Sequence, residues 1–146
     1  MAIRAITLSL AVLAFAAAPK WTAMLQPAGD SQVSGSAVVD AVAADSTLAT
    51  IQLNGAKPGS ELAWHIHFGA CGSNGKIFGA QSAYPTLKAG PDGKATGSVT
   101  LPVALPASGE YSVMVHKSAT DMAPAACGAL KPTGGPAPDS SMAPKP

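Results

Sequence analysis

The most informative segment of the chain is Leu62-Ala63-Trp64-His65-Ile66-His67-Phe68-Gly69-Ala70-Cys71. Its first seven residues alternate between large apolar side chains and alanine or histidine. A period of two predicts a β-strand with one apolar face. The opposite face carries His65 and His67. Side chains two positions apart on a strand lie roughly 6.5–7 Å apart on the same side, so both imidazoles could bind one metal ion.

The third and last histidine of the sequence ends a second alternating segment, Tyr111-Ser112-Val113-Met114-Val115-His116. Imidazole is the commonest metal ligand in proteins, and these two segments hold the only concentrated chemistry in the chain. A single histidine on a strand is more often solvated or hydrogen bonded. A metal site therefore requires His116 to lie beside the other two histidines in space, which alternation alone leaves open.

Further short alternating segments occur about every ten residues, and none shows a helical period. They cover residues 21–27, 32–43, 48–53, 95–103 and 127–130. Turn residues such as Asn54-Gly55 and Pro91-Asp92-Gly93 separate them, and residues 69–93 are expected to form a long loop. Short strands at this spacing predict an all-β sandwich or barrel.

Residues 1–18 are typical of a secretory signal peptide. Arg4 is followed by an apolar segment, and Ala16-Ala17-Ala18 offers a cleavage site. An uncleaved membrane anchor is the alternative, but the apolar segment is too short to span a bilayer comfortably. We therefore expect a periplasmic or secreted protein that has no membrane attachment after signal cleavage.

The remaining chain is expected to form a single domain over residues 19–130. Residues 131–146 contain five prolines and no core-forming pattern, which favours a disordered tail. Removing the signal peptide also removes Arg4, the only arginine, and leaves equal numbers of lysine and acidic residues. This balance argues against a nucleic-acid partner.

Cys71 and Cys127 are the only cysteines. In an exported protein two cysteines predict one disulfide; free thiols or metal ligation are the alternatives. The chain-entropy model assigns roughly 4 kcal/mol to a bridge that closes a loop of about 57 residues. Such a contribution would matter here, because aromatic residues make up only 5% of the chain and the core should be light.

The order of these segments resembles the copper-zinc superoxide dismutase family over about residues 31–130. His65-Ile66-His67 resembles its His-x-His copper pair, and Val113-Met114-Val115-His116-Lys117 resembles the segment that supplies another copper ligand. Cys71 and Ala126-Cys127-Gly128 resemble the positions of its two disulfide cysteines. The resemblance implies an eight-stranded Greek-key β-barrel with long loops over copper, which His65, His67 and His116 would bind.

Two departures from that family bear on activity. The family holds zinc with histidines and an aspartate in the loop after the His-x-His strand, but residues 71–93 contain no histidine and only Asp92. Copper is therefore expected and zinc is not. The family also places a superoxide-guiding arginine shortly before the last cysteine, where this chain has Pro124. Lys117 or Lys76 would have to supply positive charge, without the fixed guanidinium fork.

Three functions remain open. The first is an exported copper-binding, superoxide-dismutase-like protein with weak or no dismutase activity, which would hold copper or pass it to an unknown trafficking partner. The second is an active copper-only dismutase with superoxide as substrate. The third is a metal-free structural or interaction module. Because Cu(I) accepts thioether sulfur, Met114 or Met122 is an additional candidate ligand; gap-filling in the core is the ordinary role of methionine.

Overall fold

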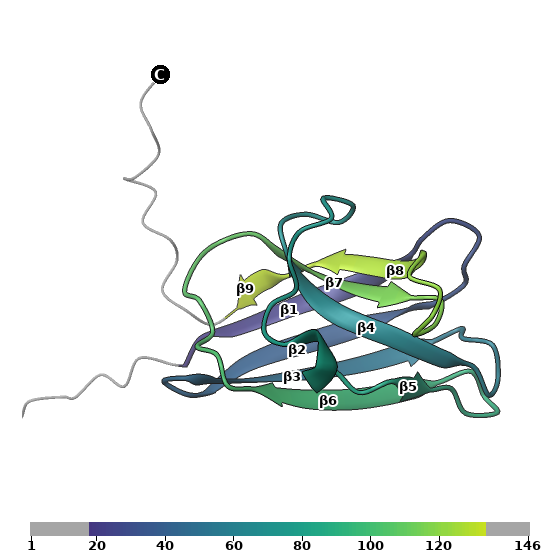
Figure 1. Ribbon diagram of the computed structural model, residues 1–146, viewed down its shortest axis with the longest axis horizontal. Coiled ribbons are helices and arrows are strands. Elements are labelled where there is room, and N and C mark those ends of the chain that lie inside the picture. The colour runs from purple at the N-terminus through teal and green to yellow at the C-terminus, as the bar shows by residue number, and fades with distance from the viewer. Residues whose placement is uncertain (1–17, 134–146) are drawn as a thin grey trace, which may run out of the picture.

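The alternating segments form the strands that their period predicts. The computed structural model describes residues 18–133, which Figure 1 shows in colour. Its strands are β1 (Lys20–Pro27), β2 (Ser34–Ala43), β3 (Ser46–Asn54), β4 (Glu61–Phe68), β5 (Leu87–Lys88), β6 (Ala95–Leu101), β7 (Tyr111–His116), β8 (Pro124–Ala129) and β9 (Lys131–Thr133). A single 3-10 turn, η1 (Gln81–Ala83), is the one helical element of this part of the chain. The predicted all-β class is confirmed.

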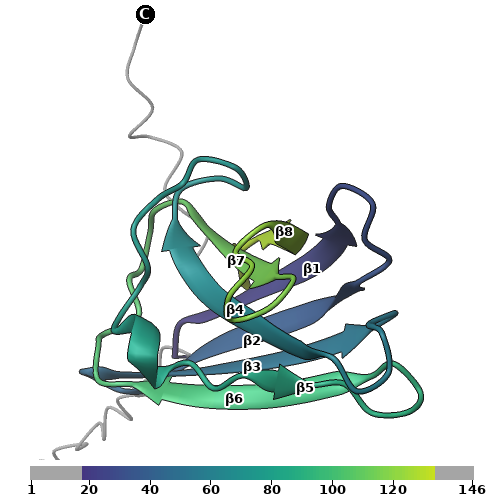
Figure 2. The same cartoon turned by 45° about the vertical axis from the view of Figure 1, so that its right-hand side comes forward.

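Eight of the strands form one antiparallel sheet in the order β5-β4-β7-β8-β1-β2-β3-β6. The two end strands, β5 and β6, contact each other, and Figure 2 shows the sheet curled into a nearly closed barrel. Strands β4, β5 and β6 follow one another along the chain and lie side by side, and the next strand, β7, returns to lie beside β4. This spatial order is that of a Greek key, so the predicted eight-stranded Greek-key barrel is confirmed.

The inward members of each alternation fill the barrel. Ala49, Ile51 and Leu53 on β3 are buried as expected, and so are Trp64 and Ile66 on β4. Many of these core positions hold small side chains, which agrees with the light core that the composition indicates. The hydrophobic effect therefore acts through many small contributions rather than a few large ones.

The outward members of β4 and β7 are not all exposed. His65 and His116 are each only 4% exposed, and Ser112 is completely buried. In an antiparallel pair, residues directly opposite each other lie on the same face. The pairs His65–Met114 and His67–Ser112 therefore share the outer face of the barrel. Loops cover this face, and the site described below lies between the strands and those loops.

The long loop expected over residues 69–93 contains short regular elements. These are η1 and β5, and β5 pairs with the start of β4. Leu87 of β5 is buried against Gly97 of β6, where a Cβ atom would overlap the leucine side chain. A glycine at this position thus permits β5 to approach β6 closely and nearly close the barrel.

The expectation of a disordered tail from residue 131 is wrong for its first three residues. Lys131–Thr133 form β9, which pairs with the start of β1. Proline is compatible with an edge strand, so Pro132 does not prevent this pairing. Strand β8 also begins earlier than expected, at Pro124 rather than near Cys127. Residues 134–146 lie outside the described part of the chain.

The expected signal peptide also falls almost entirely outside the described residues, because residues 1–17 are not described. Within residues 18–133, no helix has the length and apolarity needed to cross a membrane. Strands β1 to β8 span residues 20–129, inside the domain expected over residues 19–130, and β9 extends beyond it.

Candidate metal site

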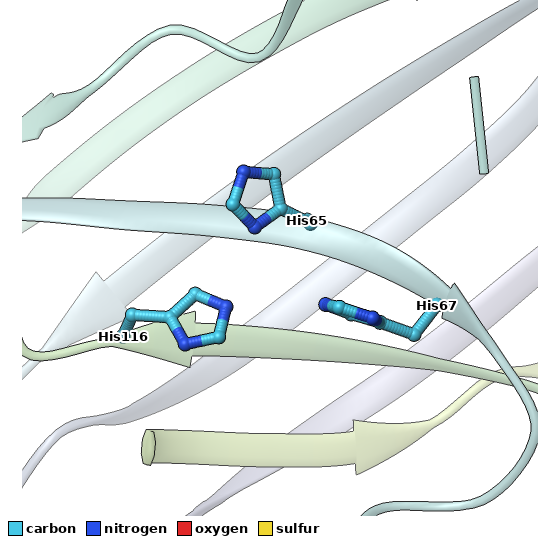
Figure 3. A group of neighbouring side chains, drawn as sticks. All are labelled: His65, His67 and His116. Carbon is cyan, nitrogen blue, oxygen red and sulfur yellow. The ribbon is translucent and has the colours of Figure 1, made fainter. Parts of the chain in front are cut away.

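The fold brings the three histidines together. His65 and His67 lie on β4, and His116 lies at the end of the neighbouring strand β7, opposite Ala63. One ring nitrogen from each histidine lies within 4.8 Å of the other two. Figure 3 shows the three rings turned toward a common centre. This is the one group of three or more histidine, cysteine or acidic side chains within residues 18–133 that is placed to hold a metal ion.

Each ring presents one buried nitrogen that has no hydrogen-bond partner among the described residues. These atoms are His65 Nδ1, His67 Nε2 and His116 Nε2. A buried polar atom without a partner is costly, because it loses its hydrogen bonds to water without replacement. Three such atoms that face one another therefore destabilise the fold of the metal-free protein. A bound metal ion would satisfy all three at once.

Hydrogen bonds to two carbonyl groups fix the protonation of two rings. His67 Nδ1 lies 2.9 Å from the carbonyl oxygen of Gly75, and His116 Nδ1 lies 2.8 Å from that of Met122. A carbonyl can only accept a hydrogen bond, so each Nδ1 must carry the proton and donate it. The Nε2 atoms of both rings are then left with free lone pairs, which is the tautomer that metal binding requires.

Burial keeps the rings of His65 and His116 uncharged at neutral pH. Burial, together with the smaller effects of the neighbouring His116 and His67, lowers the pKa of His65 to about 4. Burial also lowers the pKa of His116, against the opposing effect of its hydrogen bond to Met122. Metal ions bind neutral imidazole. Both rings are therefore ready to act as ligands without first losing a proton.

The loop after β4 forms one wall of the site. It folds back along β4 through hydrogen bonds from Phe68 N to the carbonyl of Lys76 and from Phe78 N to that of Ile66. A Cβ atom on Gly75 would overlap the carbonyl oxygen of Phe68. Only glycine therefore lets the loop lie close enough for its carbonyl to reach His67.

A disulfide ties this loop to β8. Cys71 in the loop is bonded to Cys127, and their Cα atoms are 6.0 Å apart. Cys127 lies opposite Met114 in the β7–β8 pair, so the bridge crosses the strand that ends in His116. The predicted disulfide is confirmed, and the alternatives of free thiols or metal-bound cysteines are excluded for this structure.

The loop after β7 forms a second wall. The Ser118 hydroxyl accepts hydrogen bonds from the backbone of Thr120 and Asp121, and Lys117 N donates to the carbonyl of Ala123. These bonds hold the loop in a compact turn. The turn places the carbonyl group of Met122 beside His116.

Sequence reasoning identified the three histidines but missed the groups that orient them. The Gly75 and Met122 carbonyls are backbone atoms, which no residue pattern reveals. Tyr84 was also missed: its ring centre lies 5.3 Å from that of His65, and its hydroxyl donates to the Phe78 carbonyl. An aromatic residue in a glycine-rich loop was the only available signal for this contact.

Lys117 and Lys76, the candidates to replace a guiding arginine, do not point toward the three histidines. Lys117 follows His116, but its ammonium group lies 3.0 Å from the exposed carboxylate of Asp30. This contact raises the pKa of Lys117 and lowers that of Asp30. Lys76 is exposed on the loop after β4. Neither side chain lines the cavity that borders the histidines.

Comparison with known proteins assigns no family: no protein-family model matches the chain, and no curated protein matches its sequence. The resemblance to the copper-zinc superoxide dismutase family stays a prediction. A functional assignment therefore rests on the residues of the site and on the fold that positions them.

Proposed function

We propose that this protein is an exported copper-binding domain that holds one copper ion through His65, His67 and His116. The observation that supports this most strongly is the set of three buried ring nitrogens that face one another without hydrogen-bond partners. Two of the rings are held in the metal-binding tautomer by carbonyl groups. Such outer hydrogen bonds are typical of metal-bound histidine.

Ligand chemistry favours copper over other ions. Imidazole suits copper, and the affinity order of divalent ions places Cu(II) above Zn(II). The group has three protein ligands, which excludes a closed four-ligand structural zinc site but would also suit zinc with an open position, so the preference for copper over zinc rests on the affinity order. The reduced ion Cu(I) accepts low coordination and soft ligands, so three imidazoles are sufficient for it.

The disulfide supports an exported location. Disulfides form and persist in oxidising compartments and are rare in the cytosol, and Cys71 and Cys127 are bridged. A periplasmic or secreted protein with the signal peptide expected over residues 1–18 is consistent with this bond.

We propose copper holding or transfer, with weak or no dismutation, as the main activity. Fast dismutation needs superoxide to be steered to the metal by positive charge. Residues 18–133 contain no arginine, and Lys117 is paired with Asp30. An active copper-only dismutase is the second candidate, and one observation favours it: a cavity of about 310 Å³ borders His67 and His116 and would admit a small anion.

Metal analysis tests the proposal. Protein loaded with equal amounts of Cu(II) and Zn(II) and then dialysed should retain one copper ion and no stoichiometric zinc. The double variant His65→Ala/His67→Ala should retain neither. Glu61→Gln, an exposed change on the same strand, is the matched control and should bind as the wild type does.

Two outcomes would contradict the proposal. One is stoichiometric zinc that survives copper loading, and the other is full copper binding by the double histidine variant. Superoxide consumption measured on the copper-loaded wild type separates the two candidate functions. Rapid turnover that chelators abolish and copper restores would favour the dismutase.

A further inference from the structure

The cavity beside the histidines, called the entry cavity from here on, is open to solvent and lies between β7 and the two covering loops. Its volume is about 310 Å³. Its lining residues include His67, Ser112, Met114, His116 and Met122. The lining includes two of the three ligand histidines but no carboxylate, lysine or free thiol. A hard divalent cation would therefore meet no charged ligand on this route.

Two methionines line the entry cavity at different depths. Met122 is 42% exposed, Met114 is half-buried, and His116 is only 4% exposed. Met114 lies opposite His65 on the neighbouring strand, so both side chains share the outer face of the barrel. Met122 is held beside His116, because its carbonyl accepts the hydrogen bond from His116 Nδ1.

Neither methionine serves mainly to fill the core. A gap-filling methionine is normally buried among apolar side chains, but Met122 is exposed at the edge of a cavity, and Met114 lies on the outer face of its strand. Ser112, which is fully buried and has no hydrogen-bond partner within the described residues, lines the same cavity. Its hydroxyl group is therefore available to a polar ligand that enters the cavity.

We propose that Met114 and Met122 form a thioether station through which Cu(I) passes between solvent and the three histidines. This inference rests on the proposed function and names the ion that the protein exchanges. Thioether sulfur is a soft, neutral ligand that selects Cu(I). The copper remains Cu(I) throughout, because each step only replaces one ligand by another: solvent or a donor by sulfur, and then sulfur by imidazole.

The order of exposure gives the direction of transfer. An ion that arrives from solvent meets exposed Met122 first, half-buried Met114 next, and the buried rings of His65 and His116 last. Loss of the sulfur atoms should then slow exchange more than it weakens final binding. The affinity for Cu(II), which prefers nitrogen and oxygen ligands, should not depend on them.

Kinetics of Cu(I) transfer test the station. Anaerobic uptake of Cu(I) from a coloured chelator is followed in the wild type, in Met114→Leu/Met122→Leu and in Met24→Leu. Met24 is 70% exposed on β1 and does not line the cavity, so it is the matched control. Leucine nearly preserves side-chain volume, and unfolding curves confirm that each variant folds. Uptake should slow about tenfold, equivalent to about 1.4 kcal/mol, in the double variant alone, with unchanged Cu(II) affinity.

A second measurement separates this inference from the proposed function. The variant His65→Ala/His67→Ala should retain weak Cu(I) binding, and X-ray absorption should show a sulfur neighbour at about 2.3 Å, a distance typical of metal–sulfur bonds. Equal uptake rates in the wild type and the methionine variant, or a shell without sulfur, would overturn the thioether station alone. Equal copper affinity in the wild type and the histidine variant would overturn the proposed function. Absence of Cu(I) binding by the histidine variant would likewise overturn the station alone, whereas absence of copper binding by the wild type would overturn both.

Discussion

Strands β3 and β4 belong to the same sheet but differ in what covers their outer faces. Along β3, buried residues such as Ile51 and Leu53 alternate with more exposed ones such as Gln52. Along β4, Trp64, His65 and Ile66 are buried in succession. One face of β3 packs in the core, whereas both faces of β4 are covered at its centre. The second cover consists of loops, and the residues under it are imidazoles rather than apolar side chains.

This difference separates stability from function. Strand β3 buries apolar atoms, and each one stabilises the folded state. The outer face of β4 buries nitrogens that no group within residues 18–133 satisfies, which costs stability until a ligand binds. Natural proteins depart from the usual rules of burial mainly at functional sites. The break in alternation at His65 is a departure of this kind.

The largest expected effect comes from removing the disulfide that holds the loop after β4 over the histidines. Replacing both Cys71 and Cys127 by serine should lower the free energy of unfolding by roughly 2–5 kcal/mol. It should also weaken copper binding, because the released loop carries the carbonyl of Gly75. Denaturant unfolding and a copper competition assay on the same variant measure the two effects. Loss of stability with unchanged copper affinity would show that the loop holds its position without the bridge.

A change in the core of β3 should affect stability alone. Ile51→Ala removes a completely buried side chain and should cost about 2–5 kcal/mol, as other large-to-small core changes do. The copper affinity of the folded protein should stay within about twofold of the wild type, because the side chain faces away from the histidines. Denaturant midpoints and chelator competition provide the comparison. A parallel loss of copper affinity would mean that the two faces are coupled through the sheet.

Gly75→Ala tests the loop that covers the outer face of β4. The added Cβ would overlap the Phe68 carbonyl oxygen, so the loop must shift and His67 loses its hydrogen-bond acceptor. Loss of such an outer partner typically weakens metal binding by about 10–100-fold. Gly97→Ala, which would overlap Leu87 away from the site, is the matched control. It should lower stability and leave copper affinity unchanged; equal copper loss in both variants would contradict the role given to Gly75.

Acid should lower the free energy of unfolding of the metal-free protein, because His65 on the outer face of β4 resists protonation in the folded state. The folded-state pKa of His65, about 4, lies below the ordinary value of 6.5, so the unfolded chain takes up a proton first as the pH falls. The resulting loss of stability begins near pH 6.5 and levels off below about pH 4. It should be on the order of 2 kcal/mol after allowance for partial solvent screening. Denaturant unfolding across this range should show a smaller loss in His65→Gln; an equal loss would assign the effect to other groups.

The fold was more predictable from sequence than the site. Alternation around Trp64 and Ile51 depends on burial of one face, which is a local property of each strand. The sequence-based prediction was wrong at β9, because the proline content of residues 131–146 favoured a disordered tail over a short edge strand. The proximity of His116 to the other histidines depends on the register of β4 against β7, which loop lengths do not specify. The Gly75 and Met122 carbonyls are common to all residue types, so no pattern could identify them.

The central claim is that three particular ring nitrogens bind one copper ion together. Nitrogen-15 NMR of the imidazoles tests it directly in the diamagnetic Cu(I) form. We predict that His65 Nδ1, His67 Nε2 and His116 Nε2 shift together and stop shifting at one equivalent of Cu(I), while Nδ1 of the latter two rings stays protonated. Shifts at other nitrogens, or rings that respond at different copper equivalents, would contradict the claim.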